Sequence, residues 1–133
     1  MLEIRWCAKY SDGTVVNQYD AEGKERSYEQ LDHASVVAFG LYDQESRRPL
    51  LTLHLDPGQR LIYRRRVEMK QTGDRAAAVN EVCYLVGWRR TVAGECIQSI
   101  AYVFASTGRI EMAGKFDERH AWFYSPTLRP FEE

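Results

Sequence analysis

The stretch "RLIYRRRVEMK", residues 60–70, has the pattern of a β-strand although three consecutive arginines occupy its centre. Successive side chains of a strand point to opposite faces, so Arg64 and Arg66 belong to a charged face. Arg65 falls on the other face, in line with Tyr63 and other apolar residues. A fold that contains this strand therefore has to accommodate one guanidinium among apolar side chains.

Arg65 needs a partner on such a face, because an unpaired buried charge is strongly destabilising. Three arrangements are open: an ion pair with a carboxylate, a side chain that extends to the end of the sheet, or a bound anion. Glu81 and Glu111 stand on other predicted strands and are candidate partners. The preceding strand, residues 49–55, has leucines on one face. If the turn "DPGQ" pairs it with residues 60–70, Arg65 lies on that leucine face as well.

Strict alternation marks "LEIRWCAKY", residues 2–10, as a half-buried strand. The next three residues, "SDG", suit a hairpin loop in which Gly13 takes a positive φ. The following stretch, "TVVNQY", is expected to return antiparallel. The register of this hairpin places Trp6 opposite Gln18.

Further strands are expected downstream, each bounded by turn residues. They cover residues 36–42, 49–55, 60–70, 81–90, 95–104 and 109–116. Ser27 followed by Gln30 has the form of a capping box, which predicts one short helix near residues 27–33. The longest loops are expected at residues 20–26 and 69–79.

The fold class that follows is all-β with minor α content: about eight antiparallel strands, arranged as meanders in a small sandwich or barrel. The pattern does not choose between these two architectures. Open sheet edges invite pairing with other chains, so closure of the sheet or dimerisation is expected. The stretch "FDERHAWFYSPTLRPFEE", residues 116–133, is rich in aromatic residues and is interpreted as an extended arm packed against the body.

The composition is typical of a folded globular protein, with 44% hydrophobic and 28% charged residues, and predicts a single domain over residues 1–133. The net charge of −1 offers no uniform attraction for nucleic acid. No apolar run is long enough for a membrane span or a signal peptide, so a cytoplasmic protein without membrane contact is expected. The 3 cysteines cannot all pair within one chain and are expected to be reduced.

Motifs for catalysis and metal binding are missing from the sequence. The 3 histidines are far apart and form no ligand pair, so neither a metal nor another cofactor is expected. Cys83 and Cys96 lack the neighbouring base that would mark a nucleophile. The chain is therefore predicted to be a non-enzymatic protein.

The candidate binding residues are arginines and one tryptophan: Arg64, Arg65, Arg66, Arg89, Arg90 and Trp88. Arginine and aromatic residues are enriched at protein interfaces, which favours a protein partner or self-association into a homo-oligomer. One alternative is a small β-barrel that binds nucleic acid by stacking bases on strand aromatics. The rings in question are Tyr63, Tyr84, Trp88 and Tyr102. A second alternative is a barrel with a pocket for a small ligand.

Several stretches together resemble a group of small uncharacterised proteins encoded by bacteriophages and prophages. These stretches are Trp6 with "YSDGT", "SYEQLD" leading into "VAFGLYD", "LIYRRRV", "YLVGWRR" and "KFDERHAWFY". The resemblance spans most of the chain. It implies an origin in a mobile element and expression in a bacterial cytoplasm, and it implies no catalytic or binding residue.

Overall fold

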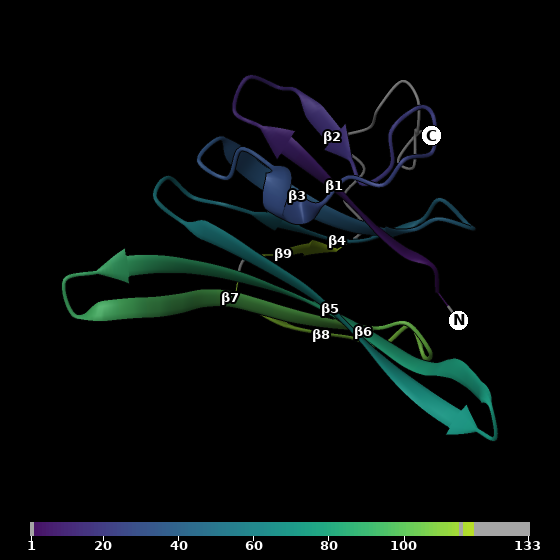
Figure 1. Cartoon of the computed structure of the whole chain (residues 1–133). Coiled ribbons are helices and arrows are strands. Elements are labelled where there is room, and N and C mark those ends of the chain that lie inside the picture. Colours follow the sequence, from purple (N-terminus) through teal and green to yellow (C-terminus); the bar gives the residue numbers. More distant parts are fainter. Residues whose placement is uncertain (1, 115, 119–133) are drawn as a thin grey trace.

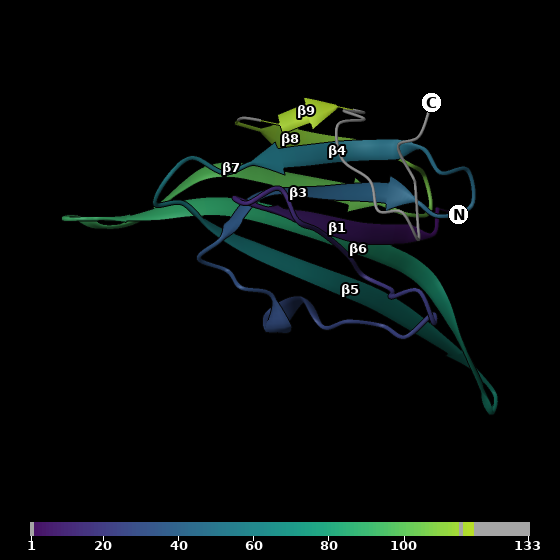
Figure 2. The same ribbon diagram turned by 90° about the horizontal axis from the view of Figure 1, so that it is seen from above.

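The computed structural model describes residues 2–114 and 116–118, which form two antiparallel β-sheets packed face to face as a sandwich (Figures 1 and 2). One sheet has five strands in the order β2-β1-β3-β4-β9, and the other has four in the order β5-β6-β7-β8. The strands are β1 Ile4–Tyr10, β2 Val15–Asn17, β3 Val36–Asp43, β4 Pro49–His54, β5 Arg60–Thr72, β6 Arg75–Thr91, β7 Gly94–Phe104, β8 Ile110–Ala113 and β9 Phe116–Glu118. This confirms the all-β fold class and selects the sandwich.

Helical structure in the described residues is limited to one 3₁₀ turn, η1, at Tyr28–Gln30. The expected cap is present, because the Ser27 N–H donates to Oε1 of Gln30 at 3.4 Å. The helix ends at once because Leu31 takes an extended conformation, with ψ 149°, and its side chain is 7% exposed in the core. No helix in the described part of the chain is long and apolar enough to cross a membrane.

The opening hairpin, β1–β2, has the predicted loop and register. The Tyr10 N–H donates to the Thr14 carbonyl at 2.8 Å, and Gly13 has φ 92°. Gln18 lies opposite Trp6, since its N–H donates to the Trp6 carbonyl at 3.0 Å and its Oε1 accepts from the Trp6 N–H at 3.1 Å. The expectation of a half-buried strand is wrong at one position, because Cys7 on the other face is also 0% exposed.

The connection after β4 does not form a hairpin. β4 pairs with β3 and β9, whereas β5 pairs with β6 in the other sheet, so "DPGQ" carries the chain from one sheet to the other. The two apolar faces still meet, because they line opposite sides of the core. Leu51 and Leu53 are 0% exposed on one side, and Leu61 and Tyr63 are 7% and 8% exposed on the other.

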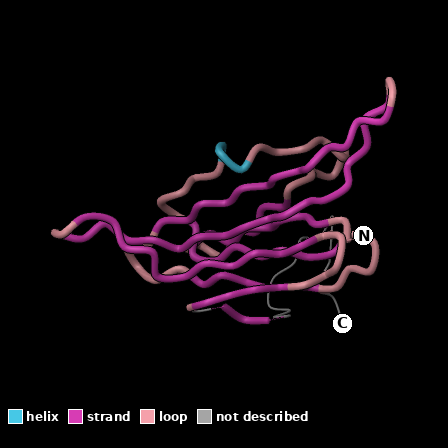
Figure 3. The backbone as a smooth tube through the Cα atoms, turned by 90° about the horizontal axis from the view of Figure 1, so that it is seen from below, coloured by secondary structure: helices cyan, strands magenta, loops and turns pink. Residues whose placement is uncertain are grey.

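Residues 69–79, expected as a loop, form the end of a long β5–β6 hairpin instead. Thr72 pairs with Arg75, so Gly73 and Asp74 alone make the turn, and Gly73 has φ 65°. A two-residue turn with a left-handed glycine connects antiparallel strands directly, so no long loop is needed. The end of this hairpin is a two-stranded ribbon that projects beyond the sandwich (Figures 1 and 3). The β6–β7 hairpin projects at the opposite end.

The predicted strand at residues 109–116 is divided between the sheets. β8 pairs with β7, and β9 pairs with β4 in the other sheet. The chain leaves β8 at Gly114, which has φ 103°, and a Cβ there would lie 2.5 Å from the Gln98 carbonyl oxygen. Only glycine fits both the conformation and the space. Beyond Glu118, the stretch interpreted as an extended arm lies outside the described residues.

We expect the substitution Gly114→Ala to lower the free energy of unfolding by about 2 kcal/mol or more, because it combines a left-handed alanine with a backbone clash. Gly13→Ala is the matched control, since Gly13 has φ 92° but no atom within 4 Å of its added Cβ. That control should lose only about 1 kcal/mol. Urea denaturation of both variants measures the difference, and equal losses would contradict the tight crossing at Gly114.

Candidate binding surface

The outer face of the four-stranded sheet is an apolar surface that the described strands leave without a covering element. Gly87 points to the core, where its added Cβ would lie 3.6 Å from Leu53, so its neighbours Val86 and Trp88 point outward. We define the outer face by its apolar residues, which are Ile62, Val82, Tyr84, Val86, Trp88, Ile100, Tyr102 and Phe104. No described element lies beneath this sheet in Figure 1.

The centre of the outer face is a row of cross-strand pairs between β6 and β7. Tyr84 lies opposite Tyr102, with ring centroids 5.9 Å apart. The next pairs along the row are Val86 with Ile100 and Trp88 with Ile97. Tyr102 is 38% and Ile97 62% exposed, whereas Val86 between them is 6% exposed. A contiguous apolar surface of this kind is characteristic of an interaction site.

Arginines border this row on the β5 side. Arg60, Arg64 and Arg66 lie opposite Trp88, Tyr84 and Val82, and no described carboxylate forms an ion pair with any of the three. Glu68 is the acidic residue that β5 adds to the same face. The β5 border therefore carries excess positive charge.

The far borders of the outer face are electrostatically balanced. Nη2 of Arg90 lies 3.6 Å from Oε1 of Glu95, and Nη2 of Arg109 lies 3.3 Å from Oε1 of Glu111. The Arg109 guanidinium also stands 4.5 Å above the centre of the Phe104 ring, a cation–π contact. The charge of the outer face is thus uneven, with its positive side along β5.

Arg65 is the residue that the sequence singled out, and its partner is Glu81. The Arg65 Nε donates to Oε1 of Glu81 at 2.5 Å, and this hydrogen bond raises the pKa of the guanidinium. The Glu81 side chain is 11% exposed and that of Arg65 is 52% exposed. Arg65 therefore combines two of the arrangements left open, the ion pair and an extension toward solvent. Glu111, the other candidate partner, pairs with Arg109.

On the core side of the Arg65–Glu81 pair, the Cys83 thiol contacts both Glu81 and Tyr63. Cys83 Sγ lies 3.9 Å from Oε1 of Glu81 and 3.7 Å from the Tyr63 hydroxyl. Burial, aided by the Glu81 charge, raises the pKa of Cys83 to about 12, and burial likewise raises the pKa of Tyr63. A thiol with such a pKa is protonated at neutral pH and is a poor nucleophile. Glu81, Cys83 and Tyr63 therefore form a buried polar cluster next to Arg65, and its thiol is not activated as a nucleophile.

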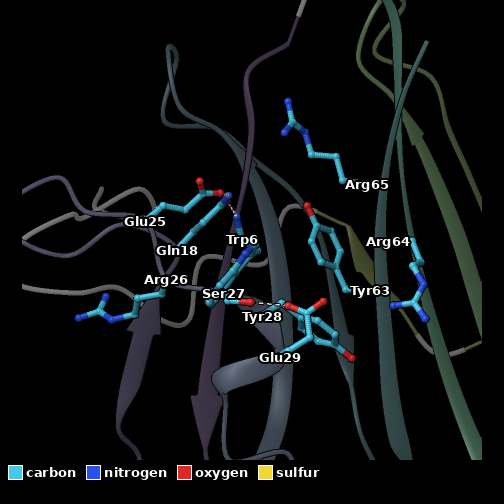
Figure 4. A pocket seen from close by; sticks show the side chains of 10 residues that line it. All are labelled: Trp6, Gln18, Glu25, Arg26, Ser27, Tyr28, Glu29, Tyr63, Arg64 and Arg65. Carbon is cyan, nitrogen blue, oxygen red and sulfur yellow. Dashed lines mark hydrogen bonds between the residues drawn. The ribbon is translucent and has the colours of Figure 1, made fainter. Parts of the chain in front are cut away.

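A cleft of about 490 Å³ opens between β5 and the segment that contains η1 (Figure 4). It is lined by Trp6, Gln18, Glu25, Arg26, Ser27, Tyr28, Glu29, Tyr63, Arg64 and Arg65. Most polar groups here are held by the protein itself. The Tyr28 hydroxyl donates to the Leu61 carbonyl at 2.6 Å, and Nε2 of Gln18 donates to Oε1 of Glu25 at 3.0 Å. The small-ligand alternative predicts an apolar cavity, whereas charged and polar side chains dominate this one.

The sequence-predicted site residues divide between the two faces of the sheet. By strand alternation Arg64, Arg66, Trp88 and Arg90 lie on the outer face, and the Arg64 side chain, on the edge strand, also lines the cleft beside η1. Arg65 and Arg89 point the other way: Arg65 pairs with Glu81, and Nη2 of Arg89 donates to the Pro57 carbonyl at 2.8 Å. Of the aromatic rings proposed for base stacking, Tyr63 is in the core, and Tyr84, Trp88 and Tyr102 are outside.

Arg60, Ile62, Ile100 and Phe104 were not predicted as site residues although they complete the outer face. The signal that could have found them is alternation outward from Tyr84 and Tyr102. Gly87 pairs with Ser99 and Trp88 with Ile97, so β7 has one extra residue, Gln98, and its alternation is interrupted there. Both faces of β6 are apolar. The residue pattern therefore does not predict which face of β6 and β7 points to the core.

Neither a metal site nor a known relative adds to this description. Within residues 2–114 and 116–118, no group of three or more His, Cys, Asp or Glu side chains could hold a metal ion. Comparison of the chain with protein-family models, with curated proteins and with solved structures finds no match. Function therefore has to be argued from the surfaces themselves.

The Arg65–Glu81 pair predicts an asymmetric response to substitution. Arg65→Gln leaves a nearly buried carboxylate without its cation, and we expect it to lower the free energy of unfolding by about 2 kcal/mol. Glu81→Gln leaves a half-exposed guanidinium in water and a side-chain oxygen that still accepts its hydrogen bond, so the loss should be below about 1 kcal/mol. Urea denaturation at neutral pH compares them. Equal losses, or the reverse order, would contradict the structural role assigned to this pair.

Proposed function

We propose that this chain is a non-enzymatic binding module that docks a partner protein on the outer face of its four-stranded sheet. The observation that carries the proposal is the row of apolar cross-strand pairs, with Tyr102 and Ile97 exposed, on a face without a covering element among the described residues. Tyrosine, tryptophan and arginine are the residues that contribute most to protein interfaces. An apolar centre with a charged border has the same layout as such interfaces.

The aliphatic residues of the outer face favour a protein over other partners. Ile62 and Ile100 are partly exposed beside the two tyrosines, and such side chains gain most from contact with apolar side chains of another protein. An origin in a phage or prophage, expected from the sequence, directs the search for a partner to bacterial proteins.

We expect Tyr102→Ser to weaken partner binding by about 10-fold or more, because truncating an aromatic residue at the centre of an interface removes its largest contact. Val37→Ser is the control, since Val37 is 36% exposed on the other sheet. Tagged wild-type and variant proteins are incubated with a bacterial lysate, and co-purified proteins are quantified by mass spectrometry. The proposal is supported if a bacterial protein co-purifies with wild type and with Val37→Ser but not with Tyr102→Ser. The proposal is contradicted if the same proteins co-purify in the same amounts with wild type and with both variants.

Single-stranded nucleic acid is a second candidate for the same face, favoured by a specific observation. Arg64 stands directly beside the Tyr84–Tyr102 pair, and Arg60 and Arg66 follow along β5. Aromatic rings on a sheet stack bases for about 1–3 kcal/mol each, and neighbouring arginines neutralise phosphates.

For this candidate we expect labelled single-stranded oligonucleotides to bind at about 50 mM salt and to weaken steeply by about 200 mM, as measured by fluorescence anisotropy. At the lower salt concentration, Arg64→Glu should bind the oligonucleotide more weakly than wild type does. Arg90→Glu changes an arginine that is already paired with Glu95, so its effect should be smaller. Absence of binding at the lower salt concentration would end this candidate and leave the protein partner.

A further inference from the structure

The free edge of β5 is a second surface, distinct from the outer face. β5 is the edge strand of its sheet and pairs only with β6. The Leu61 carbonyl accepts the Tyr28 hydroxyl from outside the sheet, so the backbone groups of odd-numbered residues point away from β6. In the described residues no hydrogen bond reaches the outward backbone groups of Arg65, Val67, Met69 and Gln71. Each of these four residues can therefore exchange backbone hydrogen bonds with another strand.

The position of this edge makes it accessible. The far end of the β5–β6 hairpin leaves the sandwich as an isolated ribbon (Figures 1 and 3). A two-stranded ribbon is only marginally stable in water, and this one exposes 57% of Met69 and 43% of Val79. Open backbone groups and exposed apolar side chains thus occur together, where the body of the protein does not obstruct a neighbour.

We propose that a second copy of this chain pairs with this edge, β5 against β5, antiparallel about a twofold axis that passes through Met69 perpendicular to the sheet. In this register Glu68 lies opposite the partner's Lys70, and Arg66 lies opposite the partner's Thr72, the last residue of β5. Met69 meets its own copy. Because the axis is twofold, each charge pair occurs twice.

Charge complementarity selects this register over its neighbours. An axis at Val67 places Arg64 opposite the partner's Lys70, and an axis at Glu68 places that carboxylate against itself. Axes at Arg65, Arg66 and Lys70 likewise bring like charges together, and an axis at Gln71 pairs only residues 70–72 before the turn begins at Gly73. Like charges directly opposite each other destabilise paired strands. The Met69 register gives opposite-charge pairs without a like-charged pair.

The consequence of this pairing is one continuous eight-stranded sheet that spans two copies, four strands from each. A twofold axis perpendicular to a sheet keeps the same face of each copy on the same side. The two outer faces, each with its Tyr84–Tyr102 row, would then lie side by side on one surface. The dimer does not depend on the partner protein proposed above, although it would present that partner with two equivalent docking faces.

Sedimentation velocity over a range of concentrations tests the proposal. Wild type should convert from monomer to dimer as concentration rises. Glu68→Lys places lysine opposite lysine twice and should weaken the dimer by about 10-fold or more, whereas the double variant E68K/K70E restores opposite charges and should return it to within about 3-fold of wild type. Glu95→Lys, a charge reversal on the β6–β7 ribbon, is the control and should dimerise as wild type does.

A wild-type protein that stays monomeric at several hundred micromolar would overturn the proposal, and so would a double variant that dimerises no better than Glu68→Lys. Circular dichroism of each variant shows that the fold is kept. The outcome is separable from that of the outer face: Tyr102→Ser should dimerise normally, and Glu68→Lys should retain each partner that binds a single outer face.

Discussion

The contact between the apolar inner faces of the two sheets is the interaction on which the rest of the structure depends. Trp6 stacks on Phe39 with ring centroids 5.5 Å apart, and Phe39 meets Tyr63 of the other sheet at 5.4 Å. The chain crosses between the sheets after β4 and again at Gly114, so each sheet has one face committed to this core. Burial of that apolar area is the main stabilising contribution in a domain of this size.

This packing also determines what remains available for binding. Only one face of the four-stranded sheet can contact the other sheet, and its outer face is apolar as well. β5 extends past the sandwich, so its outer edge has no neighbouring strand along the ribbon. Aromatic and aliphatic side chains on an open face, next to an unpaired edge, leave two surfaces whose backbone and side-chain groups are ready for a partner.

Sequence reasoning succeeded where local chemistry decides the outcome. The alternation of residues 2–10 and the glycine turn that follows predicted the first hairpin with its register, and the separation of Arg65 from Arg64 and Arg66 followed from strand geometry. The sheet to which each strand belongs could not be predicted, because alternation shows that a segment is a strand but not which strand it pairs with. A turn such as "DPGQ" can connect two strands of one sheet or carry the chain from one sheet to the other. The alanines of residues 69–79 concealed a strand, since alanine has a weak strand preference. The outer face could not be recognised because β6 is apolar on both sides.

The central claim is that the outer face is open to solvent and available to a partner. Hydroxyl-radical footprinting of the free protein, read by mass spectrometry, tests it directly. Tyr84 and Tyr102 should be modified much faster than the buried rings of Trp6, Phe39 and Tyr63. Protection of Tyr84 and Tyr102 to the level of Tyr63 would show that the face is covered and would contradict this account.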